Sequence, residues 1–239
     1  MAEGYGLKYG AVIVAAGSGR RMGEGLPKQF RMLGGLPVLG HSINLFARAM
    51  KGIEIVVVLP AGREEFWRNF AARFDIAAHR CVTGGDERFH SVRAGIGALS
   101  AAVDLVAVHD GVRPLASEEL VQRCFACAAD NGTAVPVVAP ADSYRILTAD
   151  GSSAATDRSR LRIVQTPQVF GADMLRSAYE KPFSADFTDD ATLVEHSLRM
   201  AVTLCDGERT NIKLTCPDDF AVAEAIISRR NETDTDERI

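Results

Sequence analysis

Residues 9–30 read YGAVIVAAGSGRRMGEGLPKQF, and two features of this stretch stand side by side. Residues 10–15 are small or β-branched and apolar, which predicts a buried strand. A glycine-rich turn follows directly, and Arg20, Arg21 and Lys28 come after it. Such a turn brings backbone N–H groups close to phosphate oxygens, because little side chain intervenes. The stretch therefore predicts a phosphate-binding turn at the end of a strand in an α/β sheet.

Two common phosphate loops do not match this turn. The dinucleotide fingerprint G-x-G-x-x-G has its first two glycines at Gly17 and Gly19, but Met22 stands in the third place. The Walker A loop requires serine or threonine after its lysine, whereas Lys28 is followed by Gln29. The density of cationic side chains suits a more highly charged ligand, such as a triphosphate. Because a proline precedes Lys28, we expect this lysine on an extended loop that can close over the ligand.

Length and composition limit the possible folds and partners. The 239 residues are enough for one large α/β domain or two small ones, and 47% of them are apolar. A net charge of −4 argues against a nucleic-acid-binding surface, so we expect a cationic site to be a local pocket. The odd number of cysteines, five, favours a reducing cytoplasmic location. We expect neither a signal peptide nor a membrane span, because no apolar run is long enough.

Strand-like and helix-like segments alternate along the chain. Buried strands are predicted at residues 10–15, 53–59, 104–108 and 201–205. Helices are predicted at residues 39–50, 64–74, 91–99, 172–180, 190–199 and 217–229, and after Ser117, which resembles an N-cap. This alternation predicts a mostly parallel sheet with helices on both faces.

Residues 141–163 interrupt the alternation. They are polar, and an Asp150-Gly151 pair lies between two extended stretches, which predicts a β-hairpin. An isolated two-stranded hairpin is marginal in water. We therefore expect the hairpin to pack against something else, such as a second subunit.

The segment VAVHDGVRP places a carboxylate at the end of a buried strand. Asp110 follows the strand at 104–108, and ligands of open α/β sheets bind at the carboxyl ends of strands. A carboxylate beside a triphosphate is repelled unless a cation lies between them, so Asp110 is a candidate Mg²⁺ ligand. The alternative is an aspartate that only caps a turn or helix. His109 faces the opposite side of an extended strand, and we interpret it as structural.

The segment TGGDERFHS, residues 83–91, predicts a second tight turn. Gly84, Gly85 and Asp86 are suited to reading a nucleotide base from its edge, and a helix begins near Ser91. The alternative is an ordinary loop.

In this order, the segments resemble the 2-C-methyl-D-erythritol 4-phosphate cytidylyltransferase family from about residue 9 to residue 229. The resemblance rests on AAGSGRRM, PKQF, GGDERFHSV, VHDGVRP, DRSRLRIVQTPQVF, TDDATLVE and NIKLT. It implies one Rossmann-like nucleotidyltransferase domain over residues 1–239, with residues 141–163 as a protruding β-arm that crosses to the partner in a homodimer. The implied reaction joins CTP to the phospho-alcohol 2-C-methyl-D-erythritol 4-phosphate and releases pyrophosphate, for isoprenoid precursor synthesis.

The resemblance also implies roles for individual residues. Arg20 and Lys28 would stabilise the α-phosphate during transfer, together with the leaving pyrophosphate. Lys213 would position the attacking phosphate, and Arg158 would hold the phospho-alcohol from the neighbouring subunit. Further contacts to the phospho-alcohol would come from Asp110, Arg113, Ser143, Thr166 and Thr188. The CTP contacts would be Ala15, Ala16, Gly17, Gly19, Gly85, Asp86 and Ser91. Ser143 and Gly111 depart from the family pattern, which often has threonine and usually alanine there.

The five histidines form no convincing catalytic pattern, and this chemistry needs none. A phosphate monoester has a second pKa of about 6, so it is already mostly dianionic at pH 7. The difficulty is to bring two anions together, which cationic side chains and Mg²⁺ can relieve. Three alternatives stay open at this point: a cytidylyltransferase for ribitol 5-phosphate or another phospho-polyol, an NAD-dependent oxidoreductase, and a non-catalytic nucleotide-binding protein.

Overall fold

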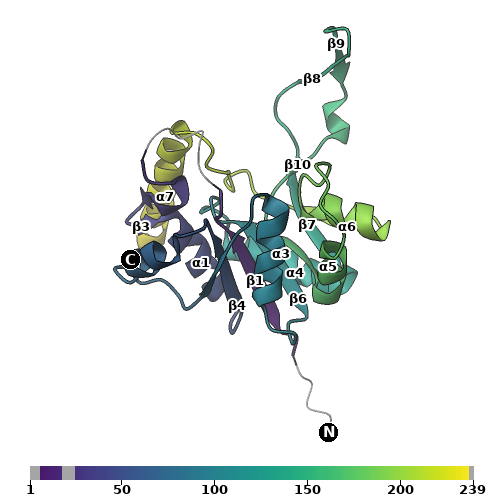
Figure 1. Ribbon diagram of the computed structural model, residues 1–239. Coiled ribbons are helices and arrows are strands. Elements are labelled where there is room, and N and C mark those ends of the chain that lie inside the picture. Colours follow the sequence, from purple (N-terminus) through teal and green to yellow (C-terminus); the bar gives the residue numbers. More distant parts are fainter. Residues whose placement is uncertain (1–5, 18–24, 237–239) are drawn as a thin grey trace.

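The computed structural model of the protein describes residues 6–17 and 25–236 (Figure 1). The strands are β1 (Tyr9–Val14), β2 (Met32–Leu33), β3 (Leu36–Pro37), β4 (Glu54–Leu59), β5 (Arg80–Thr83), β6 (Leu105–Asp110), β7 (Thr133–Val138), β8 (Tyr144–Leu147), β9 (Ser153–Thr156), β10 (Ile163–Val164), β11 (Gln168–Gly171) and β12 (Leu204–Asp206). The helices are α1 (Val38–Ala49), α2 (Glu64–Ala71), α3 (Arg88–Ala98), α4 (Glu118–Asn131), α5 (Ala172–Tyr179), α6 (Asp190–Leu198) and α7 (Asp218–Asp236), with short 3-10 turns η2 (Lys28–Phe30) and η3 (Arg158–Arg160).

The central sheet has the strand order β10-β7-β11-β6-β1-β4-β5, and β12 pairs with β7. Strand β1 lies between β4 and β6 and is parallel to both, and β4 is parallel to β5. Strand β11 runs antiparallel to its neighbours β6 and β7. The sheet is therefore mostly parallel, as the alternation of strands and helices predicts.

Helices cover both faces of this sheet. Along β1, Ala11 and Ile13 pack into the core cluster that contains residues of α1, α2 and α4, whereas Val12 packs into the cluster under α3, α5 and α6. All three side chains are fully buried. A third, smaller cluster joins α7 to the loop after β6, through Ala223, Val112 and Leu115 among others. This cluster brings the chain just before α7 to the carboxyl end of β6.

Helix α4 shows how local sequence sets the ends of an element. The Ser117 hydroxyl oxygen accepts a hydrogen bond from the Leu120 backbone N–H at 3.0 Å, which confirms the predicted N-cap. The helix ends at Gly132, whose φ of +80° is left-handed and favours glycine. The next residue begins β7, so the helix and the strand are joined by a single residue.

The predicted hairpin is present as β8 and β9, which pair antiparallel. Gly151 has a φ of +83°, and the Asp150 carboxylate accepts a hydrogen bond from the Ser152 N–H at 3.0 Å, so the turn has the expected chemistry. Figure 1 shows that the hairpin protrudes from the body of the molecule. Its large apolar side chains are exposed: Tyr144 by 40%, Ile146 by 60% and Leu147 by 78%.

Several elements differ from the sequence-based expectation. The predicted strand at 201–205 begins only at Leu204, and the last helix continues to Asp236 instead of ending near residue 229. Strands β5, β7, β10 and β11 are additions that the alternation did not predict. They extend the sheet without changing its class.

Candidate active site

Three loops meet at one edge of the sheet, and they follow β1, β5 and β6. The Ala15 N–H donates to the Val58 carbonyl at 2.8 Å, and the Gly111 N–H donates to the Val14 carbonyl at 2.9 Å. The Gly84 N–H donates in the same way to the last residue of β4, Leu59, at 2.8 Å. Each loop is thus tied to the end of a neighbouring strand. The predicted phosphate turn, base-reading turn and Asp110 segment therefore share one edge of the sheet.

Gln29 anchors the start of the phosphate turn. Its side chain is buried, and its amide nitrogen donates to the carbonyls of Ala15 at 2.8 Å and Gly17 at 3.0 Å. These bonds hold two carbonyl oxygens against the protein, away from a bound anion. Sequence reasoning missed this role, and the signal was an amide side chain directly after Lys28. The predicted residues Gly19 and Arg20 lie outside the described part of the chain.

The second turn packs directly against the first. A Cβ atom on Gly84 would lie 2.5 Å from the Cβ of Ala16 and 2.7 Å from the hydroxyl of Ser91, so only glycine allows this approach. The Ser91 hydroxyl accepts a hydrogen bond from the Gly85 N–H at 3.2 Å. Ser91 is buried, so in this structure its hydroxyl stabilises the turn. Asp86 is exposed beside it.

Asp110 is the centre of a cluster of cations. Its Oδ2 lies 2.9 Å from Nζ of Lys213 and 3.5 Å from Nε of Arg113, and its Oδ1 lies 3.7 Å from Nε of Arg88. Burial alone would raise the pKa of this carboxyl, but Arg88, Lys213 and Arg113 outweigh it and hold the pKa well below its usual range. Asp110 is therefore ionised at neutral pH.

A contact of Lys28 with the residue after Lys213 brings the segments of the two predicted catalytic lysines together. Lys28 opens the 3-10 turn η2, so the expectation of an extended loop was wrong, because the backbone turns back immediately after Pro27. Its Nζ donates to the carbonyl of Leu214 at 2.7 Å. Leu214 is held in turn by its own N–H, which donates to the Val112 carbonyl at 2.9 Å. Lys28 thus contacts the residue that follows Lys213.

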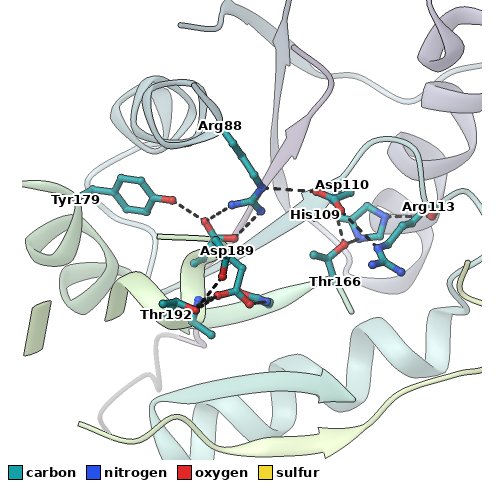
Figure 2. Close-up of polar contacts among 12 residues, drawn as sticks. Arg88, His109, Asp110, Arg113, Thr166, Tyr179, Asp189 and Thr192 are labelled. Carbon is teal, nitrogen blue, oxygen red and sulfur yellow. Dashed lines mark hydrogen bonds and ion pairs between the residues drawn. The ribbon is translucent and has the colours of Figure 1, made fainter. Parts of the chain in front are cut away.

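Thr166 contacts the Asp110 backbone, and His109 contacts Thr166. The Thr166 hydroxyl oxygen accepts a hydrogen bond from the Asp110 N–H at 3.0 Å and lies 3.1 Å from Nδ1 of His109 (Figure 2). The Asn211 side chain donates to the Thr166 carbonyl at 2.9 Å. Burial lowers the pKa of His109 to about 4, so the imidazole is neutral at pH 7. His109 is structural, as predicted, while the hydroxyl of Thr166 faces the protein interior.

A second polar network adjoins the cluster. Arg88 donates through both terminal nitrogens to Asp190, at 3.0 Å and 2.7 Å, and the Tyr179 hydroxyl donates to the same carboxylate at 2.6 Å. Figure 2 shows Arg88 between Asp110 and this group. Thr188 is exposed two residues before Asp190, and its hydroxyl lies 3.4 Å from that of Thr192. Arg88, Asp190 and Tyr179 were not among the predicted site residues, because their partners are far away in sequence.

Two predicted residues stand apart from the cluster. Arg158 and Ser143 are both exposed on the segment that carries the hairpin, which points away from the sheet in Figure 1. The guanidinium of Arg158 donates to the carbonyl of Ala141, at the base of this segment. Within the described chain, Arg158 is thus held by the arm itself and not by the Asp110 cluster.

The residues of the site do not build a metal centre by themselves. Among the described residues, no group of three or more histidine, cysteine, aspartate or glutamate side chains is placed to hold a metal ion. Asp110 can offer one carboxylate, but three cationic side chains already contact it. A metal ion at this position would need most of its ligands from a bound phosphate group.

Comparisons with known proteins agree over nearly the whole chain. The sequence profile of the family described as 2-C-methyl-D-erythritol 4-phosphate cytidylyltransferase matches residues 10–229. A protein of that name from Bacteroides fragilis is 44% identical over 219 residues, which are 91% of this chain and 98% of the relative. One of the same name from Porphyromonas gingivalis is also 44% identical, over 91% of this chain and 97% of the relative.

Solved structures give the same result for the fold. The crystal structure of 4-diphosphocytidyl-2C-methyl-D-erythritol synthase from Anaerococcus prevotii superposes with a TM-score of 0.80 and 31% identity, covering 93% of this chain and 96% of that chain. The cytidylyltransferase structure from Thermus thermophilus has a TM-score of 0.73 and 32% identity, over 90% and 97% of the two chains. Among the described helices of the present protein, none has the length and apolar character of a membrane span.

Proposed function

This chain belongs to the 2-C-methyl-D-erythritol 4-phosphate cytidylyltransferase family, and from that premise we propose how its residues carry out the reaction. The protein is a nucleotidyltransferase that joins CTP to 2-C-methyl-D-erythritol 4-phosphate. The products are 4-diphosphocytidyl-2-C-methyl-D-erythritol and pyrophosphate, in non-mevalonate isoprenoid precursor biosynthesis. The observation that best supports a site for this chemistry is at the carboxyl end of β6, where Lys213 contacts Asp110 and Lys28 contacts the residue after Lys213.

CTP binds across the two glycine turns. The cytosine lies against Gly85, Asp86 and Ser91, and the triphosphate lies along Ala15, Ala16 and Gly17. The buried bonds from Gln29 support this arrangement, because they leave the N–H groups of the first turn available to phosphate. Gly19 and Arg20 belong to the same proposal on the evidence of the sequence.

The reaction is an in-line displacement at the α-phosphorus of CTP. A phosphate oxygen of the phospho-alcohol forms the new P–O bond, the bond between the α- and β-phosphates breaks, and pyrophosphate leaves. No general base is required, because the attacking phosphate is mostly dianionic at pH 7. Arg20, Lys28 and Lys213 stabilise the charge that develops on the transferred phosphate and the leaving group. Asp110, Arg113, Thr166 and Thr188 line or support the pocket for the phospho-alcohol.

A divalent cation, Mg²⁺, accompanies the nucleotide in this proposal. Its ligands are mainly phosphate oxygens, and Asp110 is the carboxylate of the cluster that could contact it. When bound, it would neutralise part of the triphosphate charge. We assign no separate step to it.

The arm completes the site in a homodimer. One nucleotidyltransferase domain, residues 1–239, carries residues 141–163 as an inserted arm, and Arg158 and Ser143 of the arm reach the phospho-alcohol of the partner subunit. The exposed Tyr144, Ile146 and Leu147 support this proposal, because apolar side chains of an isolated hairpin gain stability by packing against another surface. The five free thiols suit a reducing compartment, and we propose a cytoplasmic location.

The test is pyrophosphate release from CTP in the presence of Mg²⁺ and a panel of phospho-alcohols. We expect the highest kcat/KM with 2-C-methyl-D-erythritol 4-phosphate and a much lower value with ribitol 5-phosphate. The reverse order would make the protein a phospho-polyol cytidylyltransferase of another specificity. Tight CTP binding without turnover would favour a non-catalytic role, and NADH binding without pyrophosphate release would favour an oxidoreductase.

A further inference from the structure

Arg88 is a charged residue that the proposed mechanism does not use. It is the first residue of α3 and directly follows the turn that contains Gly85 and Asp86. Its guanidinium crosses to Asp190, the first residue of α6, and makes two hydrogen bonds to that carboxylate, at 3.0 Å and 2.7 Å. The two residues are 102 positions apart in sequence. Arg88 therefore joins the nucleotide side of the site to the start of α6.

The same guanidinium faces a second carboxylate. Its Nε lies 3.7 Å from Oδ1 of Asp110, on the side opposite to Lys213 and Arg113, which contact Oδ2. A guanidinium can serve two carboxylates at once because its donors form a rigid planar fork, whereas an ammonium is a single point charge. Arg88 is thus suited to fix the distance between Asp110 and Asp190.

Asp190 connects Arg88 to the turn before α6. Its carboxylate is fully buried, and its described partners are Arg88 and the Tyr179 hydroxyl. The adjacent Asp189 accepts a hydrogen bond from the Thr192 N–H at 2.8 Å, which closes the turn that carries Thr188. The Gln168 side chain also holds this turn, through bonds to the Asp189 carboxylate and the Ala191 N–H, so the position of Thr188 depends in part on where Asp190 is held.

We propose that Arg88 is a positioning residue for the phospho-alcohol. Arg88 holds Asp110 and the Thr188 turn at a fixed separation without contacting the substrate itself. This inference rests on the proposed assignment of Asp110 and Thr188 to that substrate. Loss of the Arg88 contacts to Asp110 and Asp190 affects the pocket for the phospho-alcohol more than the CTP site. The reason is that the phosphate turn and Ser91 are held by bonds that do not involve Arg88.

The test separates the two substrates kinetically. In Arg88→Met, we expect KM for the phospho-alcohol to rise at least about tenfold, the scale of losing a hydrogen bond between charged groups, while KM for CTP changes less than about twofold. Arg88→Lys should recover part of the loss, because it keeps a cation beside Asp110 but cannot hold both Asp190 oxygens. Tyr179→Phe is the matched control: it removes another donor to Asp190 and should lower the melting temperature without changing the ratio of the two KM values.

An equal rise in both KM values, or the same change of ratio in Tyr179→Phe, would overturn the proposal and leave Arg88 a purely structural role. If Arg88→Met does not fold because Asp190 is left unpaired, Arg88→Met/Asp190→Asn removes both charges and should show the same selective rise. The wild type is measured beside the variants with CTP and 2-C-methyl-D-erythritol 4-phosphate. Failure of the wild type to turn over would refute the proposed function, whereas an active wild type with unchanged KM ratios in every Arg88 variant would refute only this inference.

Discussion

At the scale of single residues, the proposed chemistry depends on how two cationic side chains are held. Lys28 is held at the Leu214 carbonyl, and Lys213 is paired with an ionised Asp110. Both ammonium groups can therefore contribute to stabilising charge that develops during phosphate transfer. We predict that Lys28→Ala and Lys213→Ala each lower kcat by about 100- to 1000-fold, the usual loss for one donor to a transition state.

Steady-state turnover of CTP checks this prediction. Lys51→Ala, which removes an exposed lysine after α1, serves as the matched control and should leave kcat unchanged. Lys213 is 43% exposed, and Asp110 keeps Arg88 and Arg113 as partners, so the protein should remain folded when Lys213 is replaced. A decrease of less than about threefold in either lysine variant would contradict its role, since one donor normally contributes far more.

His109 links the support of the site to the stability of the fold. Burial lowers its folded-state pKa from 6.5 to about 4. Between these pH values, His109 is therefore protonated in the unfolded chain and neutral in the native chain. Stability is therefore complete above pH 6.5 and is lost as the pH falls towards 4. At about 1.4 kcal/mol per pKa unit, the loss from this one group is about 3 kcal/mol.

Denaturant unfolding at several pH values, in buffer with EDTA, measures this contribution. His109→Asn removes the titration, and its free energy of unfolding should depend less on pH between 6.5 and 4 than that of the wild type. His41, whose pKa is also lowered by burial, contributes equally to both proteins. Parallel pH dependences in the two proteins would show that the pKa of His109 is not lowered in the native state.

At the scale of elements, the phosphate turn depends on a side chain outside it. Gln29 lies in η2 and donates to two carbonyls of the turn after β1, so η2 and the turn form one unit. Gln29→Met keeps a similar shape but leaves both carbonyls without this donor. We predict a loss of about 1–3 kcal/mol in the free energy of unfolding, the cost of an unsatisfied buried polar group.

The same substitution should raise KM for CTP by at least about threefold, because small displacements of a binding group are costly. Gln122→Met is a suitable control, since Gln122 also donates to a backbone carbonyl, that of Ala49, in a contact unrelated to the site. Unfolding curves and CTP kinetics of both variants give the comparison. An unchanged KM for CTP in Gln29→Met would mean that the turn keeps its shape without this anchor.

Elements whose determinants are local were predictable from sequence, and elements that depend on distant partners were not. The apolar run of β1, the Asp150-Gly151 turn and the Ser117 cap each contain their own signal. Strand β7 contains Pro136, which argues against a strand within a sheet. The strand forms nonetheless through pairing with β11 and β12, and the Pro136 carbonyl accepts a hydrogen bond from the Gln165 N–H at 2.8 Å. These contacts come from segments that are distant in sequence.

Some features of the site could likewise be predicted from local sequence, and others depend on distant segments. The first glycine turn and Asp110 follow predicted strands directly, so their common edge could be predicted from the order of elements, whereas the second glycine turn follows β5, which was not predicted. The pairing of Arg88 with Asp190 and of Lys28 with Leu214 joins segments separated by 102 and 186 positions. Such pairs depend on how α6 and α7 pack against the sheet, and the motifs themselves do not encode that packing.

At the scale of the whole molecule, the chain has a net charge of −4 but holds several cationic side chains at the proposed site, where the phosphates of the two substrates would come together. Arg88, Arg113 and Lys213 come from three separate segments around one buried carboxylate, and Lys28 contacts the residue that follows Lys213. Of the other two proposed cations, Arg20 lies outside the described residues, and Arg158 contacts the Ala141 carbonyl on the arm, which protrudes from the body of the molecule (Figure 1). In the proposed homodimer, Arg158 would reach the site from the arm of the second subunit.

We predict that Arg158→Ala raises KM for the phospho-alcohol more than KM for CTP, while the neighbouring Arg160→Ala changes neither. A mixed dimer then tests whether the site is shared. Subunits that carry Arg158→Ala and Lys213→Ala are co-expressed with different tags, and the dimer that contains one of each is purified. If the arm serves the partner, one of the two sites has both native residues, and activity should be about half that of the wild type. If each subunit uses its own arm, both sites lack a cation, and the mixed dimer should be no more active than the better of the two single-variant dimers.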